Sequence, residues 1–199
     1  MNYLAHIYLS GDDDFVKIGN FIADGIKGSK YKVYDIQTQK GILLHREIDT
    51  FTDGDVIVKR SKRRLNDHYN LYRGIIIDIL YDHFLAKNWE TYSTVPLEAY
   101  SQDFYALLLR NTEILPARIQ HMMPYMIKDD WLTSYASLEG IKKVLVGMNK
   151  KTKERGEIHL AIHDLIENYS ELENDFTQFF EKLRIFSALK LKEIHNKYN

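Results

Sequence analysis

Hydrophobic residues recur every three or four positions along almost the whole chain, and no segment shows the alternation of a half-buried strand. This spacing is typical of helices that bury one face against a core. It predicts helices over residues 3–9, 15–26, 36–52, 56–66, 71–89, 97–112, 138–149 and 157–169, a further helix that Pro116 opens and Pro124 kinks or divides, and a final helix that ends near residue 194. The sequence therefore predicts an all-α fold.

Local signals mark several ends of these helices. Asp12–Asp14 offer an N-cap for the second helix, and Gly28 closes it. We expect Gly54 to adopt a left-handed conformation after the third helix and Asp55 to cap the next one. Residues 170–173, Ser-Glu-Leu-Glu, resemble a capping box for the final helix.

Composition narrows both the fold and the chemistry. The 199 residues include only 3 Pro and 10 Gly, and no linker or repeat divides them, which favours one domain over residues 1–199. Cys is absent, which excludes disulfides, thiolate nucleophiles and Cys-bound metals, and leaves the 8 His and the carboxylates as metal ligands. The N-terminal segment lacks the basic region of a signal peptide, and no apolar run reaches the ~18 residues of a membrane span. We therefore expect a cytoplasmic protein.

Two carboxylates interrupt a helical stripe that is otherwise hydrophobic. The stripe lies on the predicted helix 71–89 and consists of Ile75, Asp78, Asp82, Leu85 and Trp89. His83 is adjacent to it. An isolated buried carboxylate is costly, so each Asp is either satisfied by a structural partner or belongs to a functional site. Two Asp and one His on a single buried helix favour the functional site.

A second polar group lies on the predicted helix 36–52. His45, Asp49 and Asp53 follow one another at intervals of four residues, so that neighbouring Cβ atoms lie about 5–6 Å apart. His45 and Asp49 can therefore bind one ion, or Asp49 can orient His45. A single buried histidine is also a common core residue, and Asp53 beside Gly54 also fits a turn.

Three more polar residues stand in apolar surroundings. Asn20 and Asp24 are four residues apart on the predicted helix 15–26, which is apolar nearly all round. His6 lies in the apolar segment 4–9, where a lone histidine is more often a core residue than a ligand. We include it as a candidate because of the polar groups elsewhere in the chain.

Asp and His residues on four predicted helices, without Cys, are the ligand set of a hydrolytic Mn²⁺, Mg²⁺ or Fe site. The chain has no H-E-x-x-H motif, nucleophile elbow, P-loop or dinucleotide fingerprint. Metal-assisted hydrolysis is therefore favoured over nucleophilic catalysis. Arg46 and Arg73 are close to these carboxylates in sequence and can either clamp a phosphoryl group or pair with the same Asp residues.

A basic strip follows the third predicted helix. It consists of Lys59, Arg60, Lys62, Arg63 and Arg64. A solvated helix face is the ordinary interpretation of such a run. In a chain of net charge −1, the basic strip can instead attract a small acidic partner or bind phosphate. Nucleic acid is the less favoured partner, because no nucleic-acid motif accompanies the strip.

The sequence resembles the acyl carrier protein phosphodiesterases, also called acyl carrier protein hydrolases. The resemblance spans about Met1 to Met148 and rests mainly on residues 1–6 (MNYLAH), 18–24 (IGNFIAD), 41–53 (GILLHREIDTFTD) and 73–89, with a weaker match over 115–135. Such proteins are similar to a divergent branch of the HD-type phosphohydrolases, which are all-α metal enzymes. The resemblance therefore implies an HD-like helical domain. The usual HD signature is His followed by Asp, whereas this chain has Asp82-His83 and His45-Arg46.

The resemblance also implies an activity, the removal of phosphopantetheine from holo acyl carrier protein with Mn²⁺ as the metal. On this basis the expected ligands are Asp24, His45, Asp49 and Asp82, with Asp78 and His83 as alternates or supporting groups. His6 and Asn20 are expected to hold the water or phosphate, Arg46 and Arg73 to stabilise the phosphoryl charge, and the basic strip to dock the carrier. Two alternatives stay open: a metal-dependent phosphohydrolase for a nucleotide or other small phosphoester, and a carrier-binding module without catalysis.

Overall fold

The computed structural model describes residues 1–198, and within them the chain is helical with no strand, which confirms the all-α prediction. The α-helices are α1 (Tyr3–Tyr8), α2 (Asp14–Ile22), α3 (Ile36–Gly54), α4 (Val56–Arg64), α5 (Arg73–Lys87), α6 (Trp89–Tyr92), α7 (Leu97–Arg110), α8 (Ala117–Lys128), α9 (Trp131–Ser134), α10 (Leu138–Lys151), α11 (Ala161–Glu167) and α12 (Tyr169–Tyr198). Short 3₁₀ turns connect them: η1 (Ala23–Gly25), η2 (Gly28–Val33), η3 (Asp67–Tyr72), η4 (Thr112–Ile114) and η5 (Ile158–Leu160).

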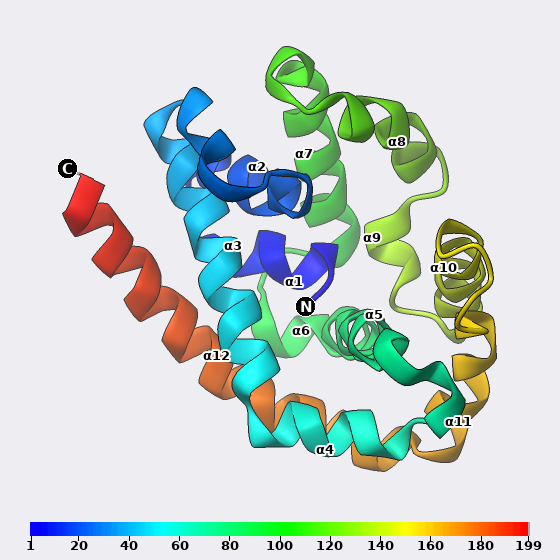
Figure 1. Ribbon diagram of the computed structural model, residues 1–199. Coiled ribbons are helices and arrows are strands. Elements are labelled where there is room, and N and C mark those ends of the chain that lie inside the picture. The colour runs from blue at the N-terminus through cyan, green and yellow to red at the C-terminus, as the bar shows by residue number, and fades with distance from the viewer. Residues whose placement is uncertain (199) are drawn as a thin grey trace.

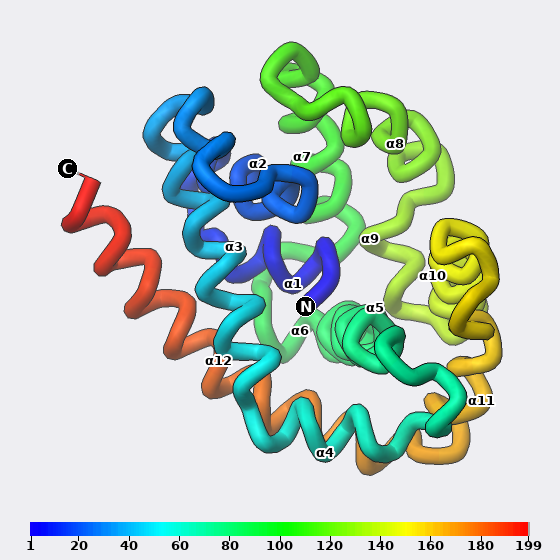
Figure 2. Tube along the Cα trace, in the orientation of Figure 1, coloured from blue at the N-terminus to red at the C-terminus, as the bar shows by residue number. Residues whose placement is uncertain are grey.

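Helix α5 occupies the centre of the molecule. Ten of its fifteen residues are buried, so it is surrounded on nearly all sides. The rings of Tyr81 and Phe84 on α5 pack against Phe176 on α12, at centroid distances of 5.5 and 6.0 Å. Figures 1 and 2 show α1 beside α5, with α3 on one side and α10 on the other. This arrangement brings the N-terminal segment into the middle of the fold.

Helices α2 and α3 approach each other unusually closely. A Cβ atom on Gly19 would collide with the carbonyl oxygen of Thr38, and one on Gly41 would collide with that of Val16. Only glycine permits such backbone contact. The contact sets the position of α2 relative to α3, and these two helices carry Asn20 and His45.

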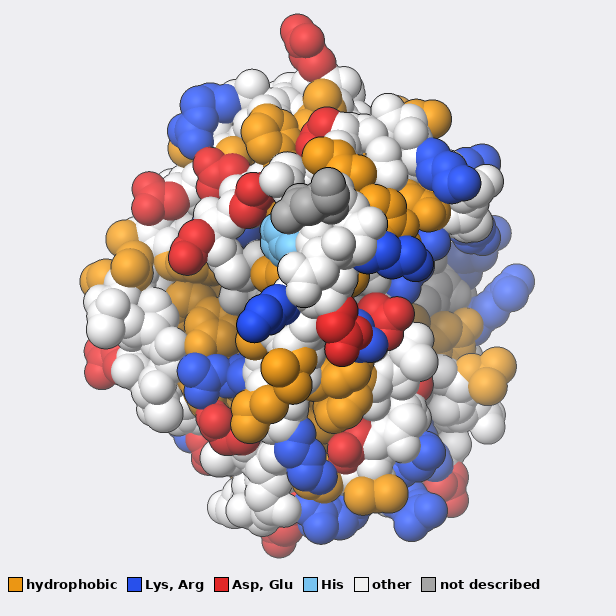
Figure 3. Space-filling view, turned by 90° about the vertical axis from the view of Figure 1, so that its left-hand side faces the viewer, with side chains coloured by type: hydrophobic (Ala, Val, Ile, Leu, Met, Phe, Trp, Pro, Cys, Tyr) orange, Lys and Arg blue, Asp and Glu red, His pale blue; other side chains and the backbone are white. Residues whose placement is uncertain are grey.

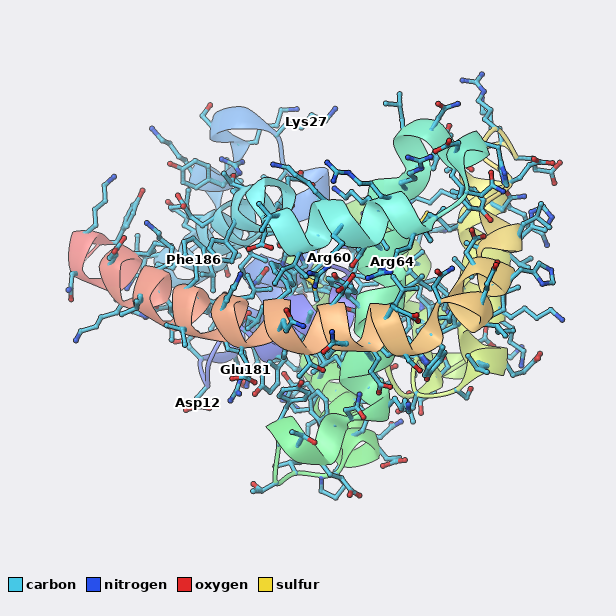
Figure 4. The ribbon with its side chains drawn as sticks, turned by 90° about the horizontal axis from the view of Figure 1, so that it is seen from below. Asp12, Lys27, Arg60, Arg64, Glu181 and Phe186 are labelled. Atoms are coloured by element: carbon cyan, nitrogen blue, oxygen red, sulfur yellow. The ribbon has the colours of Figure 1, made fainter. Side chains whose placement is uncertain are left out.

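The long helix α12 begins beside α4 and then runs along the outside of α3 (Figures 1 and 4). Its hydrophobic side packs through Phe179 and Phe186 on Phe51 of α3, at centroid distances of 6.1 and 4.2 Å. Ile185 and Leu189 remain exposed. Figure 3 shows the side of the molecule that lies on the left in Figure 1, and there charged side chains separate the hydrophobic ones into several groups.

Several predicted boundaries are wrong for local reasons. Gly54 is the last residue of α3 and has no positive φ angle, because Asp55 accepts the amide of Ile57 at 2.6 Å and starts α4 at once. Helix α12 already begins at Tyr169, so the 170–173 segment is not a capping box. The predicted helix 71–89 is divided into the end of η3, α5 and the start of α6.

Within residues 1–198, none of the helices combines the length and hydrophobicity required to cross a bilayer.

Candidate metal centre

Two buried histidines from different helices meet face to face. The imidazole rings of His6 on α1 and His45 on α3 stack with centroids 3.9 Å apart and an interplanar angle of 19°. Asp49, one turn after His45, reaches both rings: Oδ2 lies 3.1 Å from His45 Nε2 and Oδ1 lies 3.3 Å from His6 Nε2. The predicted proximity of His45 and Asp49 is therefore confirmed, and His6 joins them from a segment 39 residues earlier in the chain.

Asn20 fixes the orientation of both rings from behind. Its side-chain nitrogen donates to the carbonyl oxygen of His6 and to Ser10 Oγ, each at 2.9 Å, which leaves Oδ1 facing the histidines. This oxygen accepts from His6 Nδ1 at 2.7 Å. The backbone oxygen of Asn20, which can only accept, lies 2.8 Å from His45 Nδ1. Each Nδ1 is therefore protonated, and each Nε2 faces the carboxylates.

The carboxylates hold the two imidazoles in different charge states. Burial and the positive charge of His45 lower the pKa of His6 to about 4. Burial also opposes the charge on His45, but hydrogen bonds with Asp24 and Asp49 raise its pKa to about 9. The hydrogen bond with His45 lowers the pKa of Asp24, and the two histidines hold that of Asp49 well below its usual range despite its burial. At neutral pH a proton on His45 thus bridges two ionised carboxylates.

The residues fit a metal ion. His6 Nε2 is buried and has no partner in hydrogen-bond geometry, although Asp49 Oδ1 is close to it. One ligand atom each from His6, His45 and Asp49 lies within 4.8 Å of the others. A buried acceptor nitrogen that faces a carboxylate is unfavourable unless a proton or a metal ion lies between them. Asp24 Oδ1, at 3.2 Å from His45 Nε2, adds a fourth oxygen or nitrogen donor suited to Mn²⁺ or a similar ion.

These groups border an open cavity of about 390 Å³. Asp24 and Asp49 lie on its wall, together with hydrophobic residues of α5 and the C-terminal end of α10. The lining consists of Met1, Asn2, Tyr3, Asp24, Asp49, Thr52, Asp53, Ile75, Asp78, Ile79, Met148, Lys151 and Thr152. We call this cavity the central pocket. Its volume is in the range of small-ligand sites.

The two aspartates of α5 have other partners. Asp82 is fully buried, and its two oxygens accept the amides of Leu4 and Ala5 at 2.7 and 3.2 Å. Burial nevertheless raises the pKa of Asp82 to about 7. Asp78 accepts the amino group of Met1 at 3.0 Å. These contacts anchor the segment that carries His6. They also provide hydrogen-bond partners for the two aspartates that interrupt the hydrophobic stripe of α5.

His83 and the two predicted arginine clamps lie in other contacts. His83 Nδ1 bonds the carbonyl oxygen of Tyr135 at 2.7 Å, and its Nε2 bonds the hydroxyl of Tyr169 at 2.8 Å. Arg46 donates to the carbonyl oxygens of Ile26 and Gly28, both at 2.9 Å, and so holds the chain after Asp24. Arg73 pairs with Asp67 at the start of α5. None of the three lines the central pocket.

The basic strip forms α4, and its five cations have different surroundings. Arg60 and Arg64 lie between α4 and α12 (Figure 4), where their Nε atoms donate to the buried Asp175 at 2.8 and 3.1 Å. Lys62 pairs with Asp53 at 3.0 Å, and Lys59 donates to the carbonyl oxygen of Gly54 at 2.9 Å. Arg63 is exposed. That Arg63 and the rest of the basic strip dock the carrier protein stays a prediction.

Sequence reasoning did not single out the α10 side of the central pocket. Met148, Lys151 and Thr152 lie in a polar, Lys-rich segment that reads as an ordinary helix end. Their role depends on the turn of the chain between α10 and η5, which no local pattern indicates.

The sequence matches the acyl carrier protein phosphodiesterase family over residues 1–183. A match of this extent covers every residue of the metal centre. The chain belongs to this family. Individual relatives with this name agree along nearly their whole length. The protein of Yersinia enterocolitica is 31% identical over 181 residues, which are 90% of this chain and 94% of the relative.

Two further acyl carrier protein phosphodiesterases show the same extent of similarity. That of Serratia proteamaculans is 29% identical over 184 residues, or 92% of this chain and 95% of the relative. That of Salmonella agona is 28% identical over 191 residues, or 96% and 99%. No solved structure matches the chain, so the HD-like relationship stays a prediction.

Proposed function

We propose that this member of the family hydrolyses the phosphodiester that joins a carrier-protein serine to 4′-phosphopantetheine, and that the reaction depends on a divalent metal ion. The products are the apo carrier protein and 4′-phosphopantetheine. The observation that supports this proposal is the cluster of His6, His45 and Asp49, whose ligand atoms lie within 4.8 Å of one another beside the central pocket, which Asp49 lines.

His6 Nε2, His45 Nε2 and Asp49 would hold the ion, with Asp24 as a further ligand. The ion would supply Lewis-acid activation of water and neutralise charge on the phosphate. Mn²⁺ suits this mixed set of imidazole and carboxylate, and Mg²⁺ or Fe²⁺ are the other candidates. Asp78, Asp82 and His83 are not in the proposed ligand set. Asp78 Oδ1 accepts the amino group of Met1, both oxygens of Asp82 accept backbone amides, and both ring nitrogens of His83 have hydrogen-bond partners.

The protein's own residues prepare the site before substrate arrives. Asn20 accepts both Nδ1–H groups, so that both Nε2 atoms already face the ion site, and His45 Nε2 releases its proton when an ion binds. The lowered pKa values of Asp24 and Asp49 keep both carboxylates ionised at neutral pH. They therefore provide negative charge for a cation.

The central pocket matches the two parts of the substrate arm. Its carboxylate wall carries the metal ligands, whereas Ile75, Ile79 and Met148 provide hydrophobic surface for the pantetheine chain. The carrier itself would dock outside this pocket. Lys59, Arg60 and Arg63 are exposed, and Lys59 and Arg63 make no ion pair with a carboxylate in the described residues, so these two offer positive charge to an acidic carrier.

The proposal is tested by incubation of holo acyl carrier protein with the metal-loaded enzyme and by detection of apo carrier and phosphopantetheine by mass spectrometry. We expect His6→Ala, His45→Ala and Asp49→Asn each to lower turnover by at least about a hundredfold and to lower Mn²⁺ affinity in parallel. His163→Ala changes an exposed histidine on α11 and serves as the control. Persistent absence of phosphopantetheine release by the Mn²⁺-loaded wild type would refute the proposed substrate. Hydrolysis of a nucleotide under the same conditions would then favour the small-phosphoester alternative.

A further inference from the structure

The ammonium group of Lys62, on α4, lies at the edge of the central pocket. Its Nζ atom pairs with Asp53 Oδ1 at 3.0 Å, and Asp53 lines the pocket. A Cβ atom on Gly74 would lie 3.7 Å from the same Nζ atom, and the next residue, Ile75, also lines the pocket. Lys62 is therefore placed between two segments that form the pocket, the end of α3 and the start of α5.

The surroundings of this ammonium group do not account for its position. It lies beside the first turn of α5, where the helix dipole disfavours a cation. Its carboxylate partner is 76% exposed, whereas the side chain of Lys62 is only 24% exposed, and an ion pair with so exposed a partner contributes little to stability. A mostly covered lysine is thus held at the pocket by a carboxylate that another carboxylate can replace.

Lys62 lies on the solvent side of the metal centre. Asp53 follows the proposed metal ligand Asp49 by one turn of α3, a rise of about 5.4 Å, and is the more exposed of the two, with 76% against 43% of its side chain. A phosphodiester at the metal is joined to the pantetheine arm on one side and to the carrier serine on the other. A cation one turn outside the metal centre therefore suits a group on the carrier rather than the phosphate.

We propose that Lys62 binds a carboxylate of the carrier protein, and that Asp53 occupies Lys62 until the carrier displaces it. The identity of the partner as the carrier rests on the proposed function. The exchange replaces one carboxylate with another at a single ammonium group. Asp53 therefore competes with the carrier and weakens its binding.

Three other roles give different patterns of carrier affinity. If the pair only joins α3 to α4, loss of Lys62 and loss of Asp53 change the affinity in the same direction. If Lys62 binds the substrate phosphate, its loss weakens binding of the holo carrier but not of the apo carrier, which has no phosphopantetheine. If Asp53 only repels an acidic carrier at long range, its effect does not depend on Lys62.

The test is a double-mutant cycle on the affinity of the Mn²⁺-loaded protein for apo carrier protein, measured by calorimetric titration at low salt. Lys62→Ala should raise the dissociation constant by about threefold to tenfold, and Asp53→Asn should lower it by about twofold to threefold. In the Lys62→Ala background the effect of Asp53→Asn should vanish, because the ammonium group is gone. Lys192→Ala removes an exposed lysine of α12 and should leave the constant unchanged.

Urea unfolding of each variant checks that the fold is retained, and Lys62→Met, which keeps most of the aliphatic stem, replaces Lys62→Ala if that variant does not fold. The proposal is overturned if the wild type does not bind apo carrier, if Lys62→Ala binds it as the wild type does, or if Asp53→Asn weakens binding. It is also overturned if the effect of Asp53→Asn persists in the Lys62→Ala background.

Turnover of holo carrier protein is measured in parallel and keeps the proposed function separate. A wild type that releases no phosphopantetheine but shows the expected cycle refutes the proposed function and retains the exchange at Lys62. An active wild type whose carrier affinity does not depend on Lys62 refutes the exchange and retains the function.

Discussion

The stacked imidazoles of His6 and His45 both contact the side-chain amide of Asn20, yet the pKa of His6 is lowered and that of His45 is raised. Asn20 Oδ1 lies 2.7 Å from His6 Nδ1 and 3.2 Å from His45 Nδ1. The difference arises on the other side of the rings, where Asp24 and Asp49 approach His45 at 3.2 and 3.1 Å. His45 therefore keeps a proton that His6 does not. A metal ion that binds both Nε2 atoms has to displace this proton.

We predict that the metal-free protein loses stability between about pH 6.5 and pH 9 because of His45. Its pKa is raised from 6.5 in the unfolded chain to about 9 in the folded protein, so the stabilisation is complete below pH 6.5 and is lost as pH rises through 9. The full span corresponds to about 3 kcal/mol of unfolding free energy.

Urea unfolding in EDTA across this pH range measures the effect. The loss should disappear in His45→Gln and persist in His163→Gln, which alters an exposed histidine. An equal pH dependence in wild type and His45→Gln would contradict the assignment. Addition of Mn²⁺ should flatten the wild-type profile, because the ion replaces the proton.

We predict next that Asn20 controls metal affinity without touching the ion. Asn20→Ala removes the acceptor that holds His6 Nδ1–H, and we expect Mn²⁺ affinity to fall by about 10–100-fold. Isothermal titration with Mn²⁺ gives the affinity directly. Asn111→Ala is the matched control, because the amide of Asn111 bonds within its own helix end, to the carbonyl oxygen of Leu107. Unchanged Mn²⁺ affinity in Asn20→Ala would show that the rings are oriented by packing alone.

The contrast between helix α3 and helix α5 shows what the sequence could predict about the site. The i, i+4 spacing of His45 and Asp49 is a local relationship, and the structure confirms it. The carboxylates of α5 looked equally functional, because a pattern reveals that a buried charge needs a partner but not which partner it has. For Asp82 the partner is the N-terminal end of α1, 77 and 78 residues away in sequence.

The fold shows the same division. Helical periodicity was sufficient to predict the all-α class, and Pro96 marks the start of α7 as expected. The end of α3 was not predictable from Gly54, because the choice between a left-handed stop and an immediate cap depends on how α4 packs on α12. Likewise, the charge of Lys151 is visible in the sequence, whereas its place in the lining of the central pocket is not.

We predict that the contact between α2 and α3 tolerates no side chain. Gly19→Ala introduces a Cβ atom into the carbonyl oxygen of Thr38, and the overpacking should cost about 3 kcal/mol of unfolding free energy. The same shift would separate Asn20 from His45, so Mn²⁺ affinity should also fall. Gly147→Ala on α10 is the control, since open space surrounds that position. Thermal unfolding of the two variants measures the cost, and similar melting temperatures would refute the close contact.

The last prediction separates two uses of positive charge on α4. Arg60 donates to the buried Asp175, so Arg60→Ala should measurably lower the unfolding free energy, because it removes one partner of a buried carboxylate. Arg63 is exposed, so Arg63→Glu should leave stability unchanged within about 0.5 kcal/mol.

If the carrier protein docks on the exposed side of α4, Arg63→Glu should raise KM for holo carrier protein by about threefold to tenfold at low salt, with kcat unchanged. The increase should shrink at high ionic strength, because salt screens exposed charges. Steady-state kinetics at two salt concentrations, together with urea unfolding, measure both quantities on both variants. A KM effect in Arg60→Ala alone would place the docking surface between α4 and α12. No KM effect in Arg63→Glu at low salt would leave the exposed side of α4 as an ordinary solvated helix face.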